Sequence, residues 1–149
     1  MKAVVIDIEN VCTYGREIAA KTTVRDRISY EILDFFNDEL PKGFDLIVQC
    51  DAGVHRDDFF KKLRKSLTKS GRLVVITNID DDSDCLHYPN RQESLNMSMN
   101  KFCSSLEVPS AKRQPITIEN VKQFLLKGGF QKVEHEVWDR GEVIIQAFR

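Results

Sequence analysis

The sequence predicts an α/β fold: a mostly parallel sheet with helices on both faces, ending in a C-terminal antiparallel hairpin. Short apolar, β-branched runs alternate with amphipathic helical stretches, which is typical of strand–helix–strand units. The last two strand-like runs are separated only by Asp139-Arg140-Gly141, a hairpin signal. The length of 149 residues suits one domain, so residues 1–149 are expected to fold as a single unit.

The first half of the chain supplies three predicted strands and one short helix. Each strand is a short apolar run, and a run of this kind indicates a strand covered on both faces. The helix is predicted from its inward-facing Ile18 and Ala19. In order, the expected elements are strand Lys2–Glu9, helix Tyr14–Lys21, strand Ile28–Phe35 and strand Phe44–Cys50.

The second half begins with the clearest helical pattern, Asp57–Ser70, whose apolar stripe includes Phe60 and Leu63 and which Gly71 is expected to end. Strand Arg72–Asn78 follows. The long segment 79–115 resembles a lid, because connections of that length in compact domains are usually functional. The expected elements after it are a helix capped by Thr117 and ending at Gly128-Gly129, strand Gln131–Trp138 and strand Glu142–Phe148.

Composition excludes several function classes. The chain carries 22 Lys+Arg and 23 Asp+Glu, a net charge of −1, so no nucleic-acid partner is expected. Apolar runs are far shorter than the roughly 20 residues that cross a bilayer, and Asp7 and Glu9 interrupt the N-terminal run, so neither a membrane span nor a signal peptide is expected. The four cysteines form no CxxC pair, which predicts reduced thiols, a cytoplasmic protein and no metal site.

Two stretches resemble the class I S-adenosylmethionine-dependent methyltransferases, whose fold is Rossmann-like. Phe44–Ala52 followed by Phe59–Thr77 is similar to the family's fourth strand, the next helix and the fifth strand. The tail, a helix ending Lys127-Gly-Gly-Phe130 and then the hairpin, is similar to the family's last helix and reversed final strand. Only about 20 residues separate the first strand from Ile28, so one strand–helix unit of the family is missing.

The family's cofactor motif, a strand ending in an acid and then a glycine-rich turn, is not preserved. In one alignment, which we favour, the matching stretch is Val5–Gly15; Asp7 keeps the acid, Gly15 is a remnant glycine, and Glu9 and Val11 fill glycine positions. A Cβ at such a turn blocks the close approach of a ligand to the backbone, and Glu9 would also repel the carboxylate of the cofactor.

A second alignment treats Lys2–Glu9 as the family's second strand. Asp7 or Glu9 then becomes the ribose-binding acid, and Asp34, in a stretch resembling the family's "GD" segment, contacts adenine. The family's first strand, which lies in the middle of the sheet, would be absent. Both alignments predict a damaged cofactor site, so the chain is not expected to bind S-adenosylmethionine by itself.

The candidate site residues lie near the carboxyl ends of strands, where open α/β sheets bind ligands. Asp7, Asp34 and Asp51 are the cofactor-binding candidates implied by the resemblance. Asp51 with His55 could orient or deprotonate a substrate and is the only catalytic candidate, although both residues could equally begin an ordinary loop.

Three functions are compatible with this sequence. The first is a degenerate methyltransferase-like domain that acts as the partner or regulatory domain of an enzyme, as in the phosphoethanolamine N-methyltransferases of nematodes, which pair a catalytic with a vestigial domain. The second is an active methyltransferase on a small polar substrate. The third is an interaction module like the N-terminal domain of anamorsin-type proteins, which binds another protein domain or forms a homodimer through an exposed sheet edge.

Overall fold

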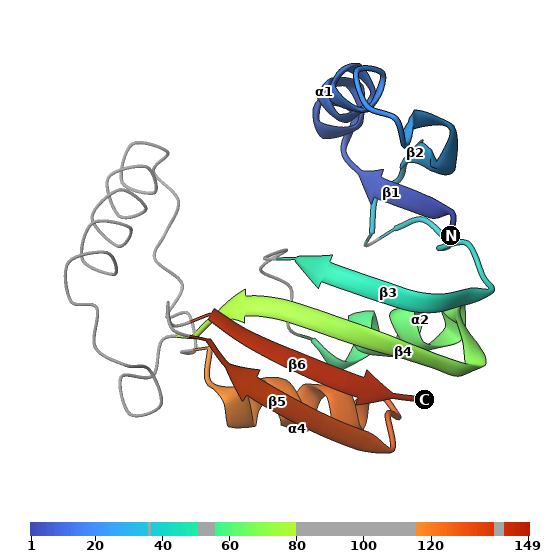
Figure 1. Cartoon of the computed structure of the whole chain (residues 1–149). Coiled ribbons are helices and arrows are strands. Elements are labelled where there is room, and N and C mark those ends of the chain that lie inside the picture. The colour runs from blue at the N-terminus through green and yellow to red at the C-terminus, as the bar shows by residue number, and fades with distance from the viewer. Residues whose placement is uncertain (36, 51–55, 80–115, 139–141) are drawn as a thin grey trace, which may run out of the picture. The chain divides into compact units, whose positions relative to one another are not determined.

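The computed structural model describes residues 1–35, 37–50, 56–79, 116–138 and 142–149 (Figure 1). The chain divides into two compact units, residues 1–41 and residues 42–149, and each is described by itself below. That residues 1–149 form one domain stays a prediction. The lid-like segment 79–115 lies outside the described residues except for Ile79, which is buried.

The N-terminal unit is a strand–helix–strand unit. Strand β1 (Ala3–Asp7) pairs in parallel with β2 (Ile28–Ile32), in a register that runs from Ala3↔Ile28 to Asp7↔Ile32. Helix α1 (Glu9–Ala19) and the 3₁₀ helix η1 (Arg25–Arg27) make the crossover. Cys12 and Ala19 form the buried face of α1, because they lie seven residues apart and thus on one side of the helix.

The C-terminal unit contains a four-stranded mixed sheet in the order β3-β4-β6-β5. Strand β3 (Phe44–Cys50) pairs in parallel with β4 (Leu67–Asn78). Strand β6 (Glu142–Phe148) is antiparallel to both β4 and β5 (Lys132–Val137) and lies between them. The mixed α/β class and the C-terminal antiparallel hairpin are therefore confirmed.

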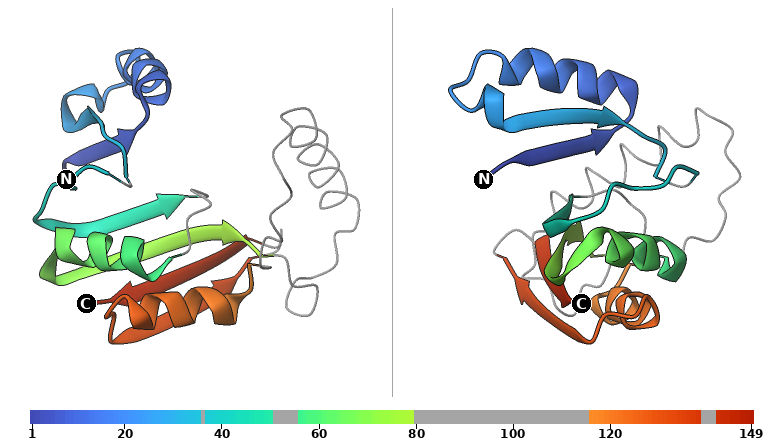
Figure 2. Two further views of the ribbon diagram at one scale, coloured as in Figure 1. Left: turned by 180° about the vertical axis from the view of Figure 1, so that it is seen from behind. Right: turned by 90° about the vertical axis from the view of Figure 1, so that its right-hand side faces the viewer.

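Helices α2 (Asp57–Ser66) and α4 (Ile118–Lys127) lie on the same side of this sheet (Figure 2). Between helices and sheet lies the core, in which Phe60, Leu73, Leu125 and Ile145 are completely buried. The predicted cap of α4 is present: the Thr117 side chain accepts a hydrogen bond from the backbone N–H of Asn120 at 3.1 Å.

Two helix boundaries differ from the prediction. Helix α2 ends at Ser66 rather than Ser70, because Leu67 leaves the helix to pair with Phe44 and become the first residue of β4. Gly71 therefore lies inside β4, where an added Cβ would stand 2.8 Å from the carbonyl oxygen of Phe44. Helix α1 begins at Glu9, five residues before the predicted Tyr14, with consequences for the cofactor motif.

Candidate functional site

Asp7 and Asp34 lie at the same edge of the N-terminal sheet. Asp7 is the last residue of β1, and its carbonyl accepts a hydrogen bond from the N–H of Leu33 at 3.4 Å, just before Asp34. The parallel pairing of β1 with β2 thus brings two acids that are 27 residues apart in the chain to one carboxyl edge. This is the edge at which α/β sheets bind ligands.

The side chains of both acids have local hydrogen-bond partners. The carboxylate of Asp7 accepts from the N–H of Ile8 at 2.8 Å. The carboxylate of Asp34 accepts from the side-chain amide of Asn37 at 2.7 Å, while the Asp34 N–H donates to Asp38 at 2.8 Å. A carboxylate accepts hydrogen bonds, so both side chains have the chemistry that hydroxyl or amino groups of a ligand require.

Cys12 contacts the carboxyl ends of both strands of this sheet. Its side chain is completely buried, and its Sγ lies 3.5 Å from the carbonyl oxygen of Asp7 and 3.4 Å from that of Glu31. A thiol has one proton, so it donates to one carbonyl at a time. Cys12 therefore links α1 to the ends of both strands that carry the acids.

The glycine-rich turn of the first alignment does not exist in this structure. One residue, Ile8, connects β1 to α1, and Glu9 is already helical. Glu9 and Val11, placed at turn positions by the first alignment, lie instead in the first turn of α1. The sequence interpretation missed this because it assigned these residues to a cofactor turn, although an acid at Glu9 is itself a helix-start signal.

Gly15 is a packing glycine rather than the remnant of a cofactor motif. It lies in the middle of α1, where an added Cβ would stand 2.4 Å from Cε1 of Tyr30 on β2. The Tyr30 hydroxyl donates a hydrogen bond to the Gly15 carbonyl at 2.9 Å. The absence of a side chain at Gly15 therefore allows the helix to lie against the tyrosine ring.

Strand β1 has one neighbour in the part of the chain that the structure describes. There it pairs in parallel with β2 alone. The choice between the two alignments stays a prediction, and so do the ribose and adenine roles that the second alignment gives to Asp7 and Asp34.

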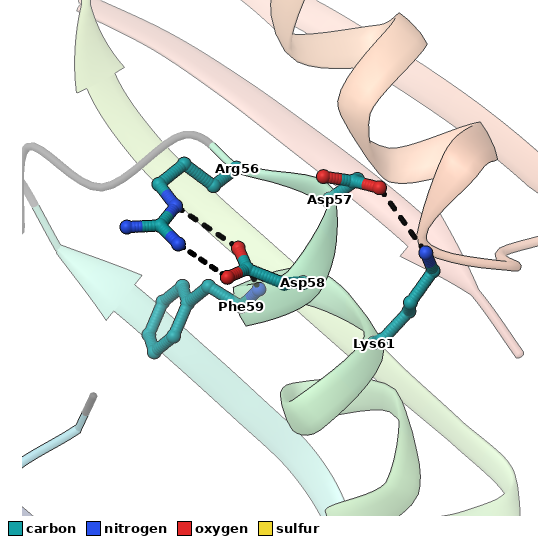
Figure 3. A network of polar contacts seen from close by, with 5 residues as sticks. All are labelled: Arg56, Asp57, Asp58, Phe59 and Lys61. Carbon is teal, nitrogen blue, oxygen red and sulfur yellow. Dashed lines mark hydrogen bonds and ion pairs between the residues drawn. The ribbon is translucent and has the colours of Figure 1, made fainter. Parts of the chain in front are cut away.

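The candidates Asp51 and His55 lie outside the described residues, but the helix that follows them begins with a charged network (Figure 3). Arg56 binds the carboxylate of Asp58 through both Nε and Nη2, the Nε–Oδ1 distance being 3.0 Å. Lys61 binds Asp57 at 3.1 Å across one helical turn. The sequence interpretation placed both acids at the helix start but missed these partners, which the four-residue spacing of Asp57 and Lys61 indicates.

These contacts favour the ionised acids. The hydrogen bond from Lys61 lowers the pKa of Asp57 below its ordinary 3.8, and those from Arg56 lower the pKa of Asp58. Two carboxylates in the first turn also offset the helix dipole. The start of α2 is therefore already neutralised and unsuited to binding an anion.

The described residues show neither a candidate metal site nor a candidate membrane span. They contain no group of three or more His, Cys, Asp or Glu side chains arranged to hold a metal ion. Nor does any helix in those parts of the chain have the length and apolarity that a bilayer crossing requires.

Comparison with known proteins identifies the fold. No protein-family model and no curated protein matches the chain. Solved structures do. Human N-acetylserotonin methyltransferase in complex with S-adenosylmethionine matches with a TM-score of 0.71 at 20% identity, over 99% of this chain and 40% of that one. An O-methyltransferase family 2 protein from Planctomyces limnophilus, in complex with apigenin, matches with a TM-score of 0.68 at 17% identity, over 99% and 43%.

The S-adenosylmethionine-dependent methyltransferase SibL, in its apo form, matches with a TM-score of 0.69 at 16% identity, over 100% of this chain and 43% of that one. The fold is that of class I methyltransferases. The chain spans less than half the length of these three structures.

Proposed function

We propose that this chain is a methyltransferase-like domain that does not bind S-adenosylmethionine by itself and serves as the partner or regulatory domain of a methyltransferase. The observation that carries the proposal is the single-residue link between β1 and α1. It leaves no loop of backbone N–H groups on which the methionine end of the cofactor could rest.

The charge at this link supports the same conclusion. Glu9 occupies the first turn of α1, where its carboxylate already interacts favourably with the positive end of the helix dipole. The carboxylate of the cofactor would meet a like charge there, which disfavours binding.

The shared edge of Asp7 and Asp34 favours a second candidate, in which the adenosine half of the site is retained and the chain binds the cofactor through it. This candidate corresponds to an active methyltransferase on a small polar substrate. Transfer of a methyl group to nitrogen or oxygen depends strongly on alignment, so the lack of a described acid–base pair does not decide between the two.

Calorimetric titration of the chain with S-adenosylmethionine separates the candidates. We expect no measurable heat at millimolar ligand, with S-adenosylhomocysteine and adenosine giving the same result. Micromolar binding that disappears in the Asp7→Ala, Asp34→Ala double variant would overturn the proposal and establish the retained half-site. Circular dichroism of the variant checks that its fold is intact.

The enzyme we propose as partner is a phosphoethanolamine-type N-methyltransferase, an assignment supported by the sequence resemblance alone. Adding the chain to such an enzyme should change its turnover of phosphoethanolamine in a saturable way. The competing interaction-module function predicts binding to another protein without any effect on methyl transfer. An unchanged rate at saturating chain would remove the phosphoethanolamine assignment.

A further inference from the structure

Basic residues of the C-terminal unit gather where helix α2 passes into strand β4. Ser66 is the last residue of α2, and its carbonyl accepts a hydrogen bond from the Gly43 N–H at 2.8 Å. The backbone at Lys42 therefore lies beside the end of the helix. From the end of β6, the Arg149 guanidinium donates a hydrogen bond to the carbonyl of Leu67, the first residue of β4.

Three more cations flank the same place. Strand β4 bulges after Leu67, because Leu67 pairs with Phe44 whereas Arg72 pairs with Leu46, only two residues further along β3. Lys69 lies in this bulge, and a lysine also occupies the last turn of α2. We call these five cations the basic junction, which consists of Lys42, Lys65, Lys69, Arg72 and Arg149. All of them except Arg149 are exposed.

Two acids border the basic junction, and both already have partners. Asp45 accepts a hydrogen bond from the Thr68 hydroxyl at 3.1 Å. Glu134 forms an ion pair with Lys132, whose ammonium lies 5.5 Å from the centre of the Phe148 ring. Lys132 offsets the charge of Glu134, so Asp45 alone stands against the five cations. Among the described residues, no side chain of the basic junction forms an ion pair.

The opposite end of the same unit carries acids. Glu142 is level with Asn78 at the end of β4, and Glu136 is level with Ile144. Glu119 lies in the first turn of α4, at the same end of the unit. The acids at the start of α2 have cationic partners of their own, as described above. Charge in this unit is thus segregated along the strands, and the basic junction forms its positive end.

The helix dipole explains only one of these cations. A lysine in the last turn of a helix offsets the negative end of the dipole, which accounts for Lys65. Lys42, Lys69 and Arg72 lie before a strand, in the bulge and within a strand, where net backbone dipoles are small. Like charges that are gathered in this way repel one another, and an anionic partner would relieve that repulsion.

We infer that the basic junction binds an acidic segment of a partner protein. Carboxylates complement its charge, and the exposed guanidinium of Arg72 has the planar fork that binds a carboxylate through two hydrogen bonds. The inference rests on the proposed role of the chain as a partner domain, and it names the chemistry that the partner presents.

Two other anionic partners fit less well. Nucleic-acid binders combine a broad positive field with aromatic rings on which bases stack. This chain has a net charge of −1, and the half-buried ring of Phe148 already lies against Lys132. A membrane surface requires a set of exposed apolar side chains beside the cations, whereas Leu46, level with Arg72, is a single one.

Fluorescence anisotropy of a fluorescein-labelled oligoglutamate peptide, titrated with the full chain, tests the inference. We expect saturable binding at low salt that weakens as the salt concentration rises, because salt screens exposed charges. The Lys69→Glu, Arg72→Glu double variant should raise the Kd at least about tenfold, because two attractions become repulsions. The matched control is Lys2→Glu, Lys21→Glu, which changes the net charge equally at two exposed lysines outside the basic junction and should leave the Kd nearly unchanged.

Each contrary result is informative once circular dichroism has shown that both double variants fold. Absence of binding at low salt overturns the inference, and so does an equal loss in both double variants, since the chain would then respond to net charge alone. Tighter binding of single-stranded DNA or of phosphatidylserine vesicles than of the peptide overturns the choice of an acidic protein. The peptide assay needs neither S-adenosylmethionine nor an enzyme, so its failure is distinct from failure of the proposed function.

Discussion

The contact between Gly15 and Tyr30 predicts that a glycine-to-alanine substitution in a helix lowers stability, which is the opposite of its usual effect. Replacing glycine by alanine in the middle of a helix ordinarily stabilises it by about 1 kcal/mol. Here the new Cβ would stand 2.4 Å from Cε1 of Tyr30, so either the ring or the helix must move. We therefore expect Gly15→Ala to destabilise the N-terminal unit.

The size of this loss of stability follows from the contacts that hold the Tyr30 ring in place. The Tyr30 hydroxyl donates to Gly15, and the Arg16 guanidinium lies 5.8 Å from the ring centre and donates to the Tyr30 carbonyl. Displacing the ring costs about 1–3 kcal/mol for overpacking and about 1 kcal/mol for the lost hydrogen bond. After subtracting the gain in helix propensity of about 1 kcal/mol, the net loss is about 1–3 kcal/mol.

Urea unfolding followed by far-ultraviolet circular dichroism measures this loss, with Trp138 fluorescence reporting the C-terminal unit separately. The control is the Tyr30→Val background, in which the ring is absent and Gly15→Ala should instead raise the free energy of unfolding by about 1 kcal/mol. Stabilisation by Gly15→Ala in the native background, or the same effect in both backgrounds, would refute the steric argument.

Three further outcomes are expected. Thr117→Ala should lower the free energy of unfolding by about 1 kcal/mol in urea titrations, because the Asn120 N–H loses its cap, whereas Thr117→Ser should retain most of it. Gly129, at φ +95°, should resist substitution, and Gly129→Ala should cost about 1 kcal/mol in the same assay, with Gly129→Asn milder. Because its pKa is lowered in the folded state, Asp58 stabilises the fold above the ordinary carboxyl pKa of 3.8, and this contribution is lost as the pH falls through the lowered value. The stability difference between the native chain and Asp58→Asn should therefore shrink over that range, and a difference unchanged by acid would contradict the pairing with Arg56.

Local signals in the sequence were sufficient for some elements. Strand β3 begins and ends where its apolar run predicts, and α4 begins after its Thr117 cap. The end of α2 was not predictable in this way, because the helical pattern continues through Leu67 while the pairing with Phe44 pulls that residue into β4. A contact between residues 23 positions apart therefore overrides the local preference.

The candidate site, too, was only partly predictable from local signals in the sequence. That Asp7 and Asp34 lie near strand ends could be predicted from the sequence, whereas their meeting at one edge depends on the long-range pairing of β1 with β2. The roles of Gly15 and Cys12 depend on side chains from β2 and on backbone carbonyls of two strands. No sequence motif predicts contacts of this kind.

The position of β6 between β4 and β5 has a consequence for biosynthesis. Within the described chain, β5 forms its ladder with β6 alone, and β4 gains its second neighbour only from β6. While residues 142–148 remain inside the ribosome, the backbones of β4 and β5 lack their β6 partner, and the apolar side chains of these strands stay exposed. Until β6 inserts between β4 and β5, these unpaired edges and apolar side chains favour aggregation of the nascent chain.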